Sequence, residues 1–174
     1  MNFCVIVDVC ACLSYNENVK INYINEGKEA RTMNILFFLT PKSEVAYLYD
    51  DYSLRQAIEK MQHYRYSAVP IINRNGNYMG TITEGDLLWH IKEKRLKDLY
   101  DAEDVPLSEV DRHWYNEPVN AQCDIDDLVM SCMNQNFVPV IDDNHTFIGI
   151  VTRKDIMLYC YNSYKENLQK SKTG

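Results

Sequence analysis

One pattern of residues occurs twice in this chain, 69 positions apart, and this repeat constrains the fold more than any other feature. Residues 67–72 read Ser-Ala-Val-Pro-Ile-Ile and lead to Gly-Thr-Ile-Thr-Glu-Gly-Asp, while residues 136–141 read Asn-Phe-Val-Pro-Val-Ile and lead to Gly-Ile-Val-Thr-Arg-Lys-Asp. A single long repeat is typical of two related halves that pack together, whereas solenoids repeat at shorter periods. The identical positions in the first copy are Val69, Pro70, Ile72, Asn75, Gly80, Thr83 and Asp86.

Length and charge narrow the class of protein. The chain has 174 residues, of which 46% are hydrophobic and 25% charged, which suits one compact domain or two small lobes. Its net charge of -7 argues against nucleic acid as the main partner, since that binding depends on clustered Lys and Arg. A nucleotide stays possible, because its phosphates need only one or two donors. No apolar run approaches the ~20 residues that span a bilayer, so we predict no membrane association.

The cysteines indicate a reducing compartment rather than a metal site. They form no Cys-x-x-Cys pair, and no His stands at metal-ligand spacing from them. We therefore predict reduced thiols, a cytoplasmic location and no metal or cofactor. Cys132 and Cys160 fall in amphipathic helical patterns, where a free Cys behaves as a small buried apolar residue.

Residues 1–32 differ from the rest of the chain, and three interpretations are open. The apolar run from Phe3 to Leu13 lacks the basic region and the small-residue cleavage site of a signal peptide. An added strand at a sheet edge is a second possibility. We favour a third, in which residues 1–32 are a non-native or disordered extension and translation starts at Met33. Codons for residues 27–30 can contain a purine-rich ribosome-binding sequence at a normal distance before Met33.

In the first half, the sequence predicts a strand followed by a helix. Residues 45–49 are β-branched and aromatic, which favours a strand. Ser53 and Gln56 form a capping box, so a helix is predicted to begin at Leu54. Helical spacing assigns its buried face to Leu54, Ala57, Ile58 and Met61.

A hairpin and a second helix complete that half. Residues 66–72 and 78–83 are predicted strands, and Asn75-Gly76 predicts a two-residue turn between them because both residues tolerate positive φ. A helix is predicted from Glu84. The order β-α-β-β-α therefore describes the first half.

The second half repeats this order. Residues 118–120 are its weakest predicted strand, Asp124 is predicted to cap a helix, and residues 137–141 and 146–152 are predicted hairpin strands. The first helix is two residues shorter than its counterpart. The closing helix is predicted to bury Ile156, Met157, Cys160, Tyr161 and Tyr164.

These elements predict an α/β (α+β) fold with four segments. They are the extension 1–32, a first motif at 33–96, an acidic connector at 97–117, and a second motif with a C-terminal helix at 118–174. The connector holds seven carboxylates and Pro106, which is typical of a solvated linker.

The motif Gly-x-x-Thr-x-x-Asp suits a nucleotide. Thr83 and Thr152 are predicted to end a strand, with Asp86 and Asp155 in the first turn of the next helix. There, unpaired backbone N–H groups and the helix dipole favour a phosphate, and the Thr hydroxyl adds a donor. The Asp can accept hydrogen bonds from two ribose hydroxyls. The structural alternative is that Thr is a helix N-cap and needs no ligand, although the motif occurs twice in register.

On these residues the chain resembles a tandem CBS protein of the stand-alone bacterial type. The resemblance covers about residues 34–162 and includes Thr40-Pro41, Val45, residues 51–58, Met61 and both repeats. It implies two CBS motifs packed by their sheets as a pseudo-twofold pair with two clefts between them. It also implies a homodimer that binds regulatory adenosine ligands such as AMP, ADP or ATP and signals to a separate partner.

The resemblance also implies a set of ligand-binding residues. Asp86 and Asp155 would bind ribose hydroxyls, and Thr83 and Thr152 would face phosphate. The base pockets would be lined by Val45, Ala46, Ala68, Val69, Pro70, Phe137, Val138 and Pro139.

The two clefts are expected to differ. Arg153 and Lys154 follow Thr152 and suit phosphate, whereas Glu84 and Gly85 follow Thr83 and do not. We therefore expect the cleft of Asp155 to take the charged end of a ligand and the cleft of Asp86 to bind weakly or not at all. The shortened helix and the weak strand at Val119 depart from the pattern and affect the cleft that they border.

Other functions are possible. No Ser, Cys or paired carboxylate accompanies the histidines as catalysis would require, and no Gly-rich phosphate loop is present, so we do not expect an enzyme. His63 and His90 are expected on helices, partly exposed. The run His113-Trp114-Tyr115 could form an aromatic wall against a base or support a core or dimer seam. A structural homodimerisation module with vestigial clefts and a cyclic di-AMP receptor are the alternatives.

Overall fold

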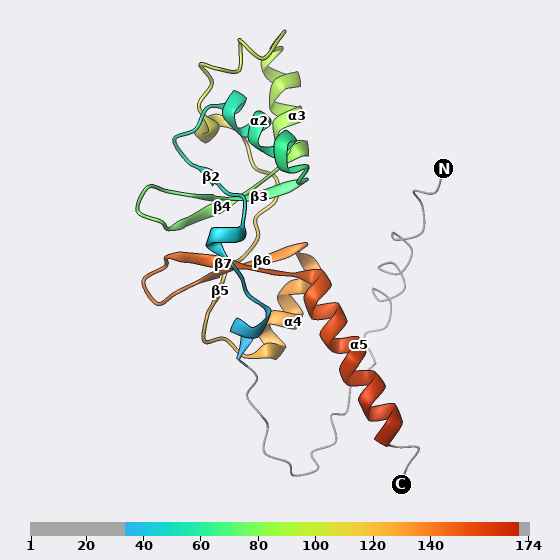
Figure 1. Ribbon diagram of the computed structural model, residues 1–174. Coiled ribbons are helices and arrows are strands. Elements are labelled where there is room, and N and C mark those ends of the chain that lie inside the picture. Colours follow the sequence, from blue (N-terminus) through green and yellow to red (C-terminus); the bar gives the residue numbers. More distant parts are fainter. Residues whose placement is uncertain (1–33, 171–174) are drawn as a thin grey trace, which may run out of the picture. The chain divides into compact units, whose positions relative to one another are not determined.

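The computed structural model describes residues 34–170, which form two lobes with the same order of elements (Figure 1). The predictions about residues 1–32 lie outside this range. The first lobe contains β2 (Leu48–Tyr49), α2 (Leu54–Tyr64), β3 (Ala68–Ile72), β4 (Tyr78–Thr83) and α3 (Glu84–Lys94). The second contains β5 (Val119–Asn120), α4 (Ile125–Asn134), β6 (Phe137–Ile141), β7 (Phe147–Thr152) and α5 (Arg153–Lys170). The predicted β-α-β-β-α order is confirmed in both lobes.

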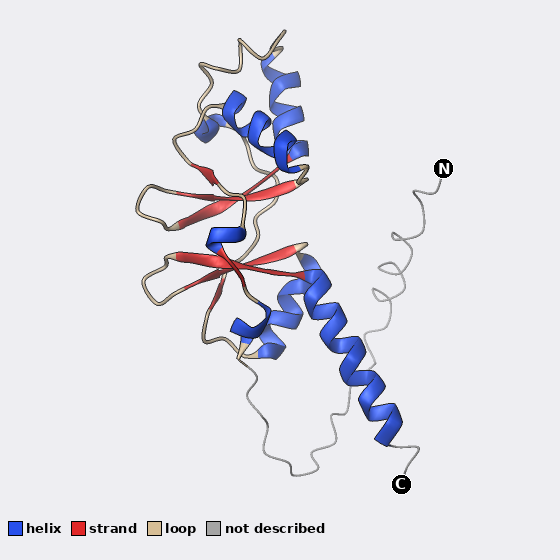
Figure 2. Ribbon diagram, viewed as in Figure 1, coloured by secondary structure: helices blue, strands red, loops and turns tan. Residues whose placement is uncertain are grey.

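Each lobe is one sheet with helices packed on one face (Figure 2). The first sheet has the order β2-β3-β4, in which β2 is parallel to β3 and β4 is antiparallel to it. The second has the order β1-β7-β6-β5. Its additional strand, β1 (Thr40–Pro41), precedes the whole first lobe in the sequence. The two sheets contact each other through their hairpins, where the Phe147 N–H donates to the Gly76 carbonyl and the Tyr78 and Phe147 rings stack.

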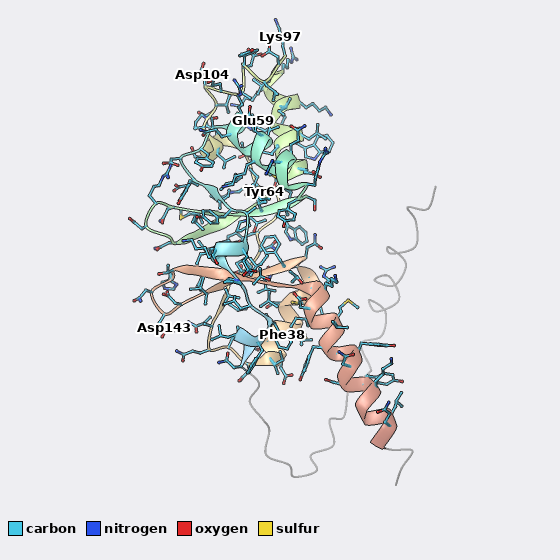
Figure 3. The ribbon with its side chains drawn as sticks, in the orientation of Figure 1. Phe38, Glu59, Tyr64, Lys97, Asp104 and Asp143 are labelled. Carbon is cyan, nitrogen blue, oxygen red and sulfur yellow. The ribbon has the colours of Figure 1, made fainter. Side chains whose placement is uncertain are left out.

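The segment before the first lobe belongs to the core of the second. Thr40 in β1 lies opposite Ile150 in β7, and Ile35 in the short helix η1 (Ile35–Phe38) is fully buried with the second core. The Phe38 ring meets the Tyr159 ring of α5 edge to face, 5.2 Å between centroids (Figure 3). The sequence places this segment next to the first repeat, but its contacts tie it to the second lobe.

The acidic connector is partly a core element. Its carboxylates are exposed, as expected of a solvated linker. Ala102, Leu107 and Val110 are nevertheless buried in the first core, and the connector backbone pairs with the start of α2 through Leu107 N to the Tyr52 carbonyl. The expectation of a purely solvated linker is therefore wrong, because acidic residues outnumber these three apolar side chains and hide their pattern. The residue boundaries of the two predicted motifs stay predictions.

Helix faces follow the predictions in the first lobe and depart from them in α5. Leu54, Ala57 and Met61 are buried in α2, and Ile58 is half-buried against the same core. In α5, Ile156 is buried, whereas the predicted buried residues Met157, Cys160, Tyr161 and Tyr164 are exposed. The side of α5 that packs carries Ile156 and Tyr159, and the remaining apolar stripe faces away from the core.

Local capping and turn geometry correct two further predictions. The capping box of Ser53 and Gln56 is present, but the Asp124 side chain makes no cap hydrogen bond. The hairpin turn spans Asn73 to Asn77, and only Gly76, with φ of 90°, has the left-handed conformation. A two-residue turn with two positive φ values is therefore wrong for Asn75-Gly76, because the Asn73 side chain accepts from the Asn77 N–H and widens the loop.

Candidate functional site

Thr83 and Asp86 form a closed capping box at the start of α3. The Asp86 N–H donates to Thr83 Oγ1 at 3.1 Å, while Thr83 N and Oγ1 both donate to Asp86 Oδ2, at 2.9 and 2.8 Å. Thr83 is the last residue of β4 and Asp86 lies in the first helical turn, as predicted. The structure therefore shows the capping role that was the structural alternative for this motif.

The connector occupies the other carboxylate oxygen of Asp86. The His113 N–H donates to Asp86 Oδ1 at 3.1 Å, and His113 Nδ1 lies 3.4 Å from the same atom. Asp86 is only 3% exposed. Burial opposes ionisation, but the hydrogen bonds from His113 and Thr83 outweigh it and lower the pKa of Asp86. Both oxygens that would bind a ribose are thus engaged within the chain.

Thr152 and Asp155 form the corresponding pair at the start of α5, with fewer hydrogen bonds than Thr83 and Asp86 make. Thr152 Oγ1 donates to Asp155 Oδ2, and the Asp155 N–H donates back to Thr152 Oγ1 at 3.3 Å. Asp155 is half-buried, and among the described residues its Oδ1 has no hydrogen-bond partner. The second copy of the motif therefore has a free acceptor at the start of an 18-residue helix, α5.

The two basic residues after Thr152 have different surroundings. Arg153 Nε donates to the Cys132 and Gln135 carbonyls, each at 2.9 Å, which ties α5 to the last turn of α4. Lys154 is exposed and bonds to no described residue. Lys154 therefore fits the predicted phosphate role better than Arg153, whose Nε supports the fold.

Val45 and Ala46 lie where the chain crosses from one lobe to the other. They follow β1 and the short helix η2 (Lys42–Glu44), which both contact β7, and they precede β2, which pairs with β3. Val45 is half-buried and Ala46 is buried. These two predicted base-pocket residues lie before the strand rather than in it, because only Leu48–Tyr49 of the strand predicted over residues 45–49 forms β2, and the segments on either side of them contact the two sheets.

The other predicted base-pocket residues divide between two faces of their strands. Strand register pairs Ala68 with Thr83 and Phe137 with Thr152, so each lies beside one Thr of the motif. Val69 and Val138 are buried in the helix-covered cores of their lobes. Since side chains alternate across a strand, Ala68, Pro70, Phe137 and Pro139 lie on the opposite face, away from those cores.

A small cavity borders Thr83. Its volume is about 190 Å³, and Ala68, Thr83, Trp114, Asn116 and Asn136 are among its lining residues. This is below the ~300 Å³ at which most ligand pockets begin. The cavity adjoins a second one of about 380 Å³, because Trp114 and Asn134 line both, and Asp86 is not among the lining residues of either.

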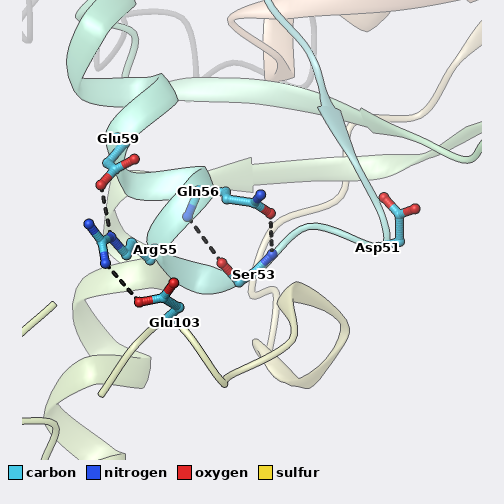
Figure 4. Close-up of a pocket in the computed structure, with 6 residues that line it drawn as sticks. All are labelled: Asp51, Ser53, Arg55, Gln56, Glu59 and Glu103. Carbon is cyan, nitrogen blue, oxygen red and sulfur yellow. Dashed lines mark hydrogen bonds and ion pairs between the residues drawn. The ribbon is translucent and has the colours of Figure 1, made fainter. Parts of the chain in front are cut away.

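A larger depression lies elsewhere, at the start of α2 (Figure 4). It measures about 460 Å³, but its polar groups are already paired. Arg55 contacts Glu59 at 2.9 Å and Glu103 at 2.8 Å, and Ser53 and Gln56 cap the helix. This depression is a solvated surface of satisfied charges rather than a binding site.

The described part of the chain places further limits on function. Across residues 34–170, no helix is long and apolar enough to cross a membrane. In the same range, no three His, Cys, Asp or Glu side chains converge as a metal site requires.

His90, expected to be partly exposed, is 4% exposed, and its Nε2 has no partner among the described residues. His90 lies one turn after Asp86 on the same buried side of α3. The position of His90 in the predicted helix did not by itself indicate this burial.

Two glycines of the repeat allow a crossing segment to pass close to a strand, a role that the sequence analysis missed. A Cβ at Gly149 would lie 2.2 Å from the Thr40 carbonyl oxygen, and one at Gly80 would lie 2.5 Å from Arg112 Nη1. Arg112 Nη1 donates to the Met79 carbonyl, so it is a connector side chain that lies over Gly80, whereas at Gly149 it is the backbone of β1. The sequence did carry a signal for this close approach, since a Gly precedes Thr and Asp at the same spacing in both copies of the repeat.

Comparison with known proteins gives a family match and several structural neighbours. A family model described as "CBS domain" matches residues 38–93 and 118–162. An A-adding tRNA nucleotidyltransferase from Aquifex aeolicus is 30% identical over 118 residues, which is 68% of this chain and 13% of that enzyme. The chain therefore spans only a small part of this curated relative.

Solved structures with this fold include complexes with ligands. CbpB in complex with c-di-AMP has a TM-score of 0.69 and 24% identity, covering 80% of this chain and 91% of that chain. CBSX2 in complex with AMP has a TM-score of 0.59 and 18% identity, covering 75% and 98%. At these identities the similarity shows a shared fold.

Proposed function

This chain belongs to the CBS domain family, and from this premise we propose that it is a non-catalytic regulatory module that binds an adenosine-type nucleotide beside Asp155. The observation that carries the proposal is the contrast between the two motif carboxylates. Asp86 has both oxygens bonded within the chain, whereas Asp155 Oδ1 has no partner among the described residues. An acceptor beside a helix N-terminus suits a ribose hydroxyl next to a phosphate.

The phosphate would lie at the start of α5. Backbone N–H groups in the first turn of a helix lack intrahelical acceptors, and the helix dipole favours an anion there. Lys154 is exposed one residue before Asp155 and adds a cation. Thr152 Oγ1 can rotate to donate to a phosphate oxygen once a ribose hydroxyl donates to Asp155.

The base would lie between the crossing segment and the strand beside Thr152. Val45 and Ala46 provide an apolar edge close to both sheets, and Phe137 lies next to Thr152 in the register. Pro139 shares the strand face of Phe137. This arrangement keeps the predicted base-pocket role for these four residues and removes Val69 and Val138, whose side chains lie in the lobe cores.

The structural neighbours support a regulatory ligand of this class. CbpB was solved with c-di-AMP and CBSX2 with AMP, and both share the fold of this chain. AMP, ADP and ATP are the ligands that we propose first, with cyclic di-AMP as the alternative. We further propose a cytoplasmic homodimer that passes a conformational change to a separate protein. A ligand shifts such an equilibrium only by its difference in affinity for the two states.

A structural dimerisation module without a ligand is the second candidate. It is favoured by exposed apolar side chains on α4 and α5, including Met130, Met133, Met157 and Tyr161. The nucleotidyltransferase match gives no reason to propose catalysis, since the matched region spans 13% of that enzyme.

A thermal-shift panel on the full chain tests the proposal. The ligands are AMP, ADP, ATP, S-adenosylmethionine and cyclic di-AMP, each with the unchanged chain and with Asp155→Ala. A ligand at ~100 times its Kd stabilises by ~2.7 kcal/mol, which raises Tm by roughly 2–4 °C per kcal/mol at this size. We expect a rise with an adenine nucleotide that Asp155→Ala abolishes. A flat panel on folded protein would favour the dimerisation module.

A further inference from the structure

Large apolar side chains are exposed on one side of both lobes, where α3 and α5 begin. The small cavity beside Thr83 is also lined by Asn134, so the start of α3 and the end of α4 lie on the same side of the molecule. Phe137 follows α4 and pairs with Thr152, which places the start of α5 there as well (Figure 1). We call the exposed apolar residues on this side the helix face: Tyr64, Tyr66, Leu88 and Trp89 in the first lobe, and Met130, Met133, Met157 and Leu158 in the second. Exposed apolar patches of this kind mark interaction surfaces.

The two halves of the helix face differ in chemistry. The half on the first lobe has three aromatic rings, of which Tyr64 and Tyr66 stack with centroids 5.9 Å apart. The half on the second lobe has three methionines and no aromatic ring, and the repeat places Leu158 at the position of Trp89. Methionine sulfur makes favourable contacts with aromatic rings. Each half therefore complements the other half better than it complements itself.

The charges that border the helix face also differ between the lobes. The Lys92 ammonium lies 5.0 Å from the centre of the Trp89 ring, and residues 92–95 (Lys-Glu-Lys-Arg) make the end of α3 basic. In α4, exposed Asp127 lies one turn before Met130. Residues 124–134 contain three Asp and neither Lys nor Arg. The aromatic half is thus bordered by cations and the methionine half by carboxylates.

A second copy of the chain can meet this face in two orientations related by a twofold axis. In a parallel pair, the first lobe faces the first lobe of the other copy, so the basic ends of α3 face each other and so do the acidic starts of α4. In an antiparallel pair, aromatic halves meet methionine halves and basic ends meet acidic starts, twice by symmetry. The helix starts favour the same choice, since Glu84 is exposed in α3 and Lys154 in α5. Complementary charges of this kind set the orientation of an interface.

We propose that the helix face binds a second copy of this chain in the antiparallel orientation. The first lobe of each copy packs against the second lobe of the other copy. The inference rests on the homodimer of the proposed function and adds the surface and the orientation of that dimer.

Sedimentation equilibrium of full-length variants tests the surface. Trp89→Glu and Met133→Glu each place an unpaired charge in the centre of the interface. We expect each to raise the dimer Kd by roughly a hundredfold or more. Leu99→Glu is the matched control, because Leu99 is exposed to a similar extent but lies in the connector. It should dimerise like the unchanged chain.

Charge reversal tests the orientation. Lys92→Glu and Asp127→Lys are measured singly and together. In the antiparallel dimer, each single reversal creates two like-charged pairs and should raise Kd roughly threefold to tenfold at low salt, whereas the double reversal should restore the original Kd. In a parallel dimer, every variant would keep like charges opposite each other, so all would have the Kd of the unchanged chain. This series decides even if Trp89→Glu does not fold.

The proposal is overturned if the unchanged chain is a monomer, if Trp89→Glu and Met133→Glu both dimerise as it does, or if the reversals leave Kd unchanged. None of these variants alters Asp155 or Lys154, so the thermal shift with AMP remains an independent test of the nucleotide site. A monomer that AMP stabilises would overturn the dimer alone. A dimer that no nucleotide stabilises would overturn the nucleotide site alone.

Discussion

His113 covers Asp86: its backbone N–H and its imidazole both approach one carboxylate oxygen of a residue that lies 27 positions earlier. The contact fastens the connector across the start of α3 and engages the second carboxylate oxygen of Asp86. No described residue makes the corresponding contact with Asp155. In the first copy of the motif both carboxylate oxygens are bonded within the chain, whereas in the second copy one of them has no partner among the described residues. The predictions below rest on this difference.

Replacing Asp86 should lower stability in a pH-dependent way. Its pKa is lowered in the folded chain, so the unfolded chain binds the proton more readily. The resulting stabilisation is complete above the unfolded Asp value of ~3.9 and is lost as pH falls through the lower folded value. We expect Asp86→Asn to lose about 1–3 kcal/mol at pH 7. Urea unfolding from pH 7 to pH 2.5 should show this difference from the unchanged chain shrinking in acid.

Asp104→Asn is the control for that series. Asp104 is an exposed carboxylate of the connector and bonds to no described residue. It should unfold like the unchanged chain at every pH. A difference for Asp86→Asn that stays constant down to pH 2.5 would contradict the account of His113 and Thr83 as partners of the charged form.

The close approach of β1 to β7 predicts that Gly149→Ala is destabilising. The new Cβ would lie 2.2 Å from the Thr40 carbonyl, a backbone atom that cannot move without displacing β1. We expect a loss of about 1–3 kcal/mol, measured by thermal or urea unfolding. Gly85→Ala is the control, because its nearest contact is 3.5 Å away and Ala favours the helix. Equal stability of the two variants would show that β1 does not pair as described.

Because part of the connector is buried, we predict that alanine substitutions at two of its leucines change the stability by different amounts. Leu107 is 3% exposed in the first core, and Leu99 is 46% exposed. We expect Leu107→Ala to cost about 2–5 kcal/mol and Leu99→Ala to stay within about 0.5 kcal/mol of the unchanged chain. Urea unfolding of both variants measures this. A connector that acts only as a solvated linker would give the same small effect for both.

Replacing Arg153 should lower the stability of the fold, whereas replacing its neighbour Lys154 should weaken nucleotide binding. Arg153→Met removes the Nε donor shared by the Cys132 and Gln135 carbonyls and should cost about 1–3 kcal/mol of unfolding free energy. Lys154→Met should leave Tm unchanged and weaken nucleotide binding roughly threefold to tenfold, as loss of one exposed charge does. Unfolding and binding measured on both variants test this. The opposite pattern would assign the phosphate to Arg153.

Much of the architecture follows from local patterns in the sequence. The capping box at Ser53, the helical spacing of Leu54, Ala57 and Met61, and the two Thr-to-Asp junctions act over a few residues, so they are visible without a structure. The repeat then assigns the same order to the second half. These local signals account for the success of the β-α-β-β-α prediction.

The features that depend on distant contacts were not predictable in the same way. Ile35 is buried against a lobe that begins more than 80 residues later, and no local pattern reports that pairing. Leu107 and Val110 stand in a connector rich in acidic residues, which conceal the burial that the two share. The closure of Asp86 by His113 likewise joins two segments whose sequences carry no matching signal.

The most direct test of the nucleotide site is isothermal titration calorimetry with AMP on three full-length proteins: the unchanged chain, Asp155→Ala and Asp86→Ala. We predict one site per chain. Asp155→Ala should weaken it by roughly tenfold to a hundredfold, since a hydrogen bond to a charged group contributes about 1.5–3 kcal/mol. Asp86→Ala should bind AMP at Asp155 with unchanged affinity. Loss of binding in Asp86→Ala but not in Asp155→Ala, with both proteins folded, would contradict the assignment of the ligand to the open carboxylate.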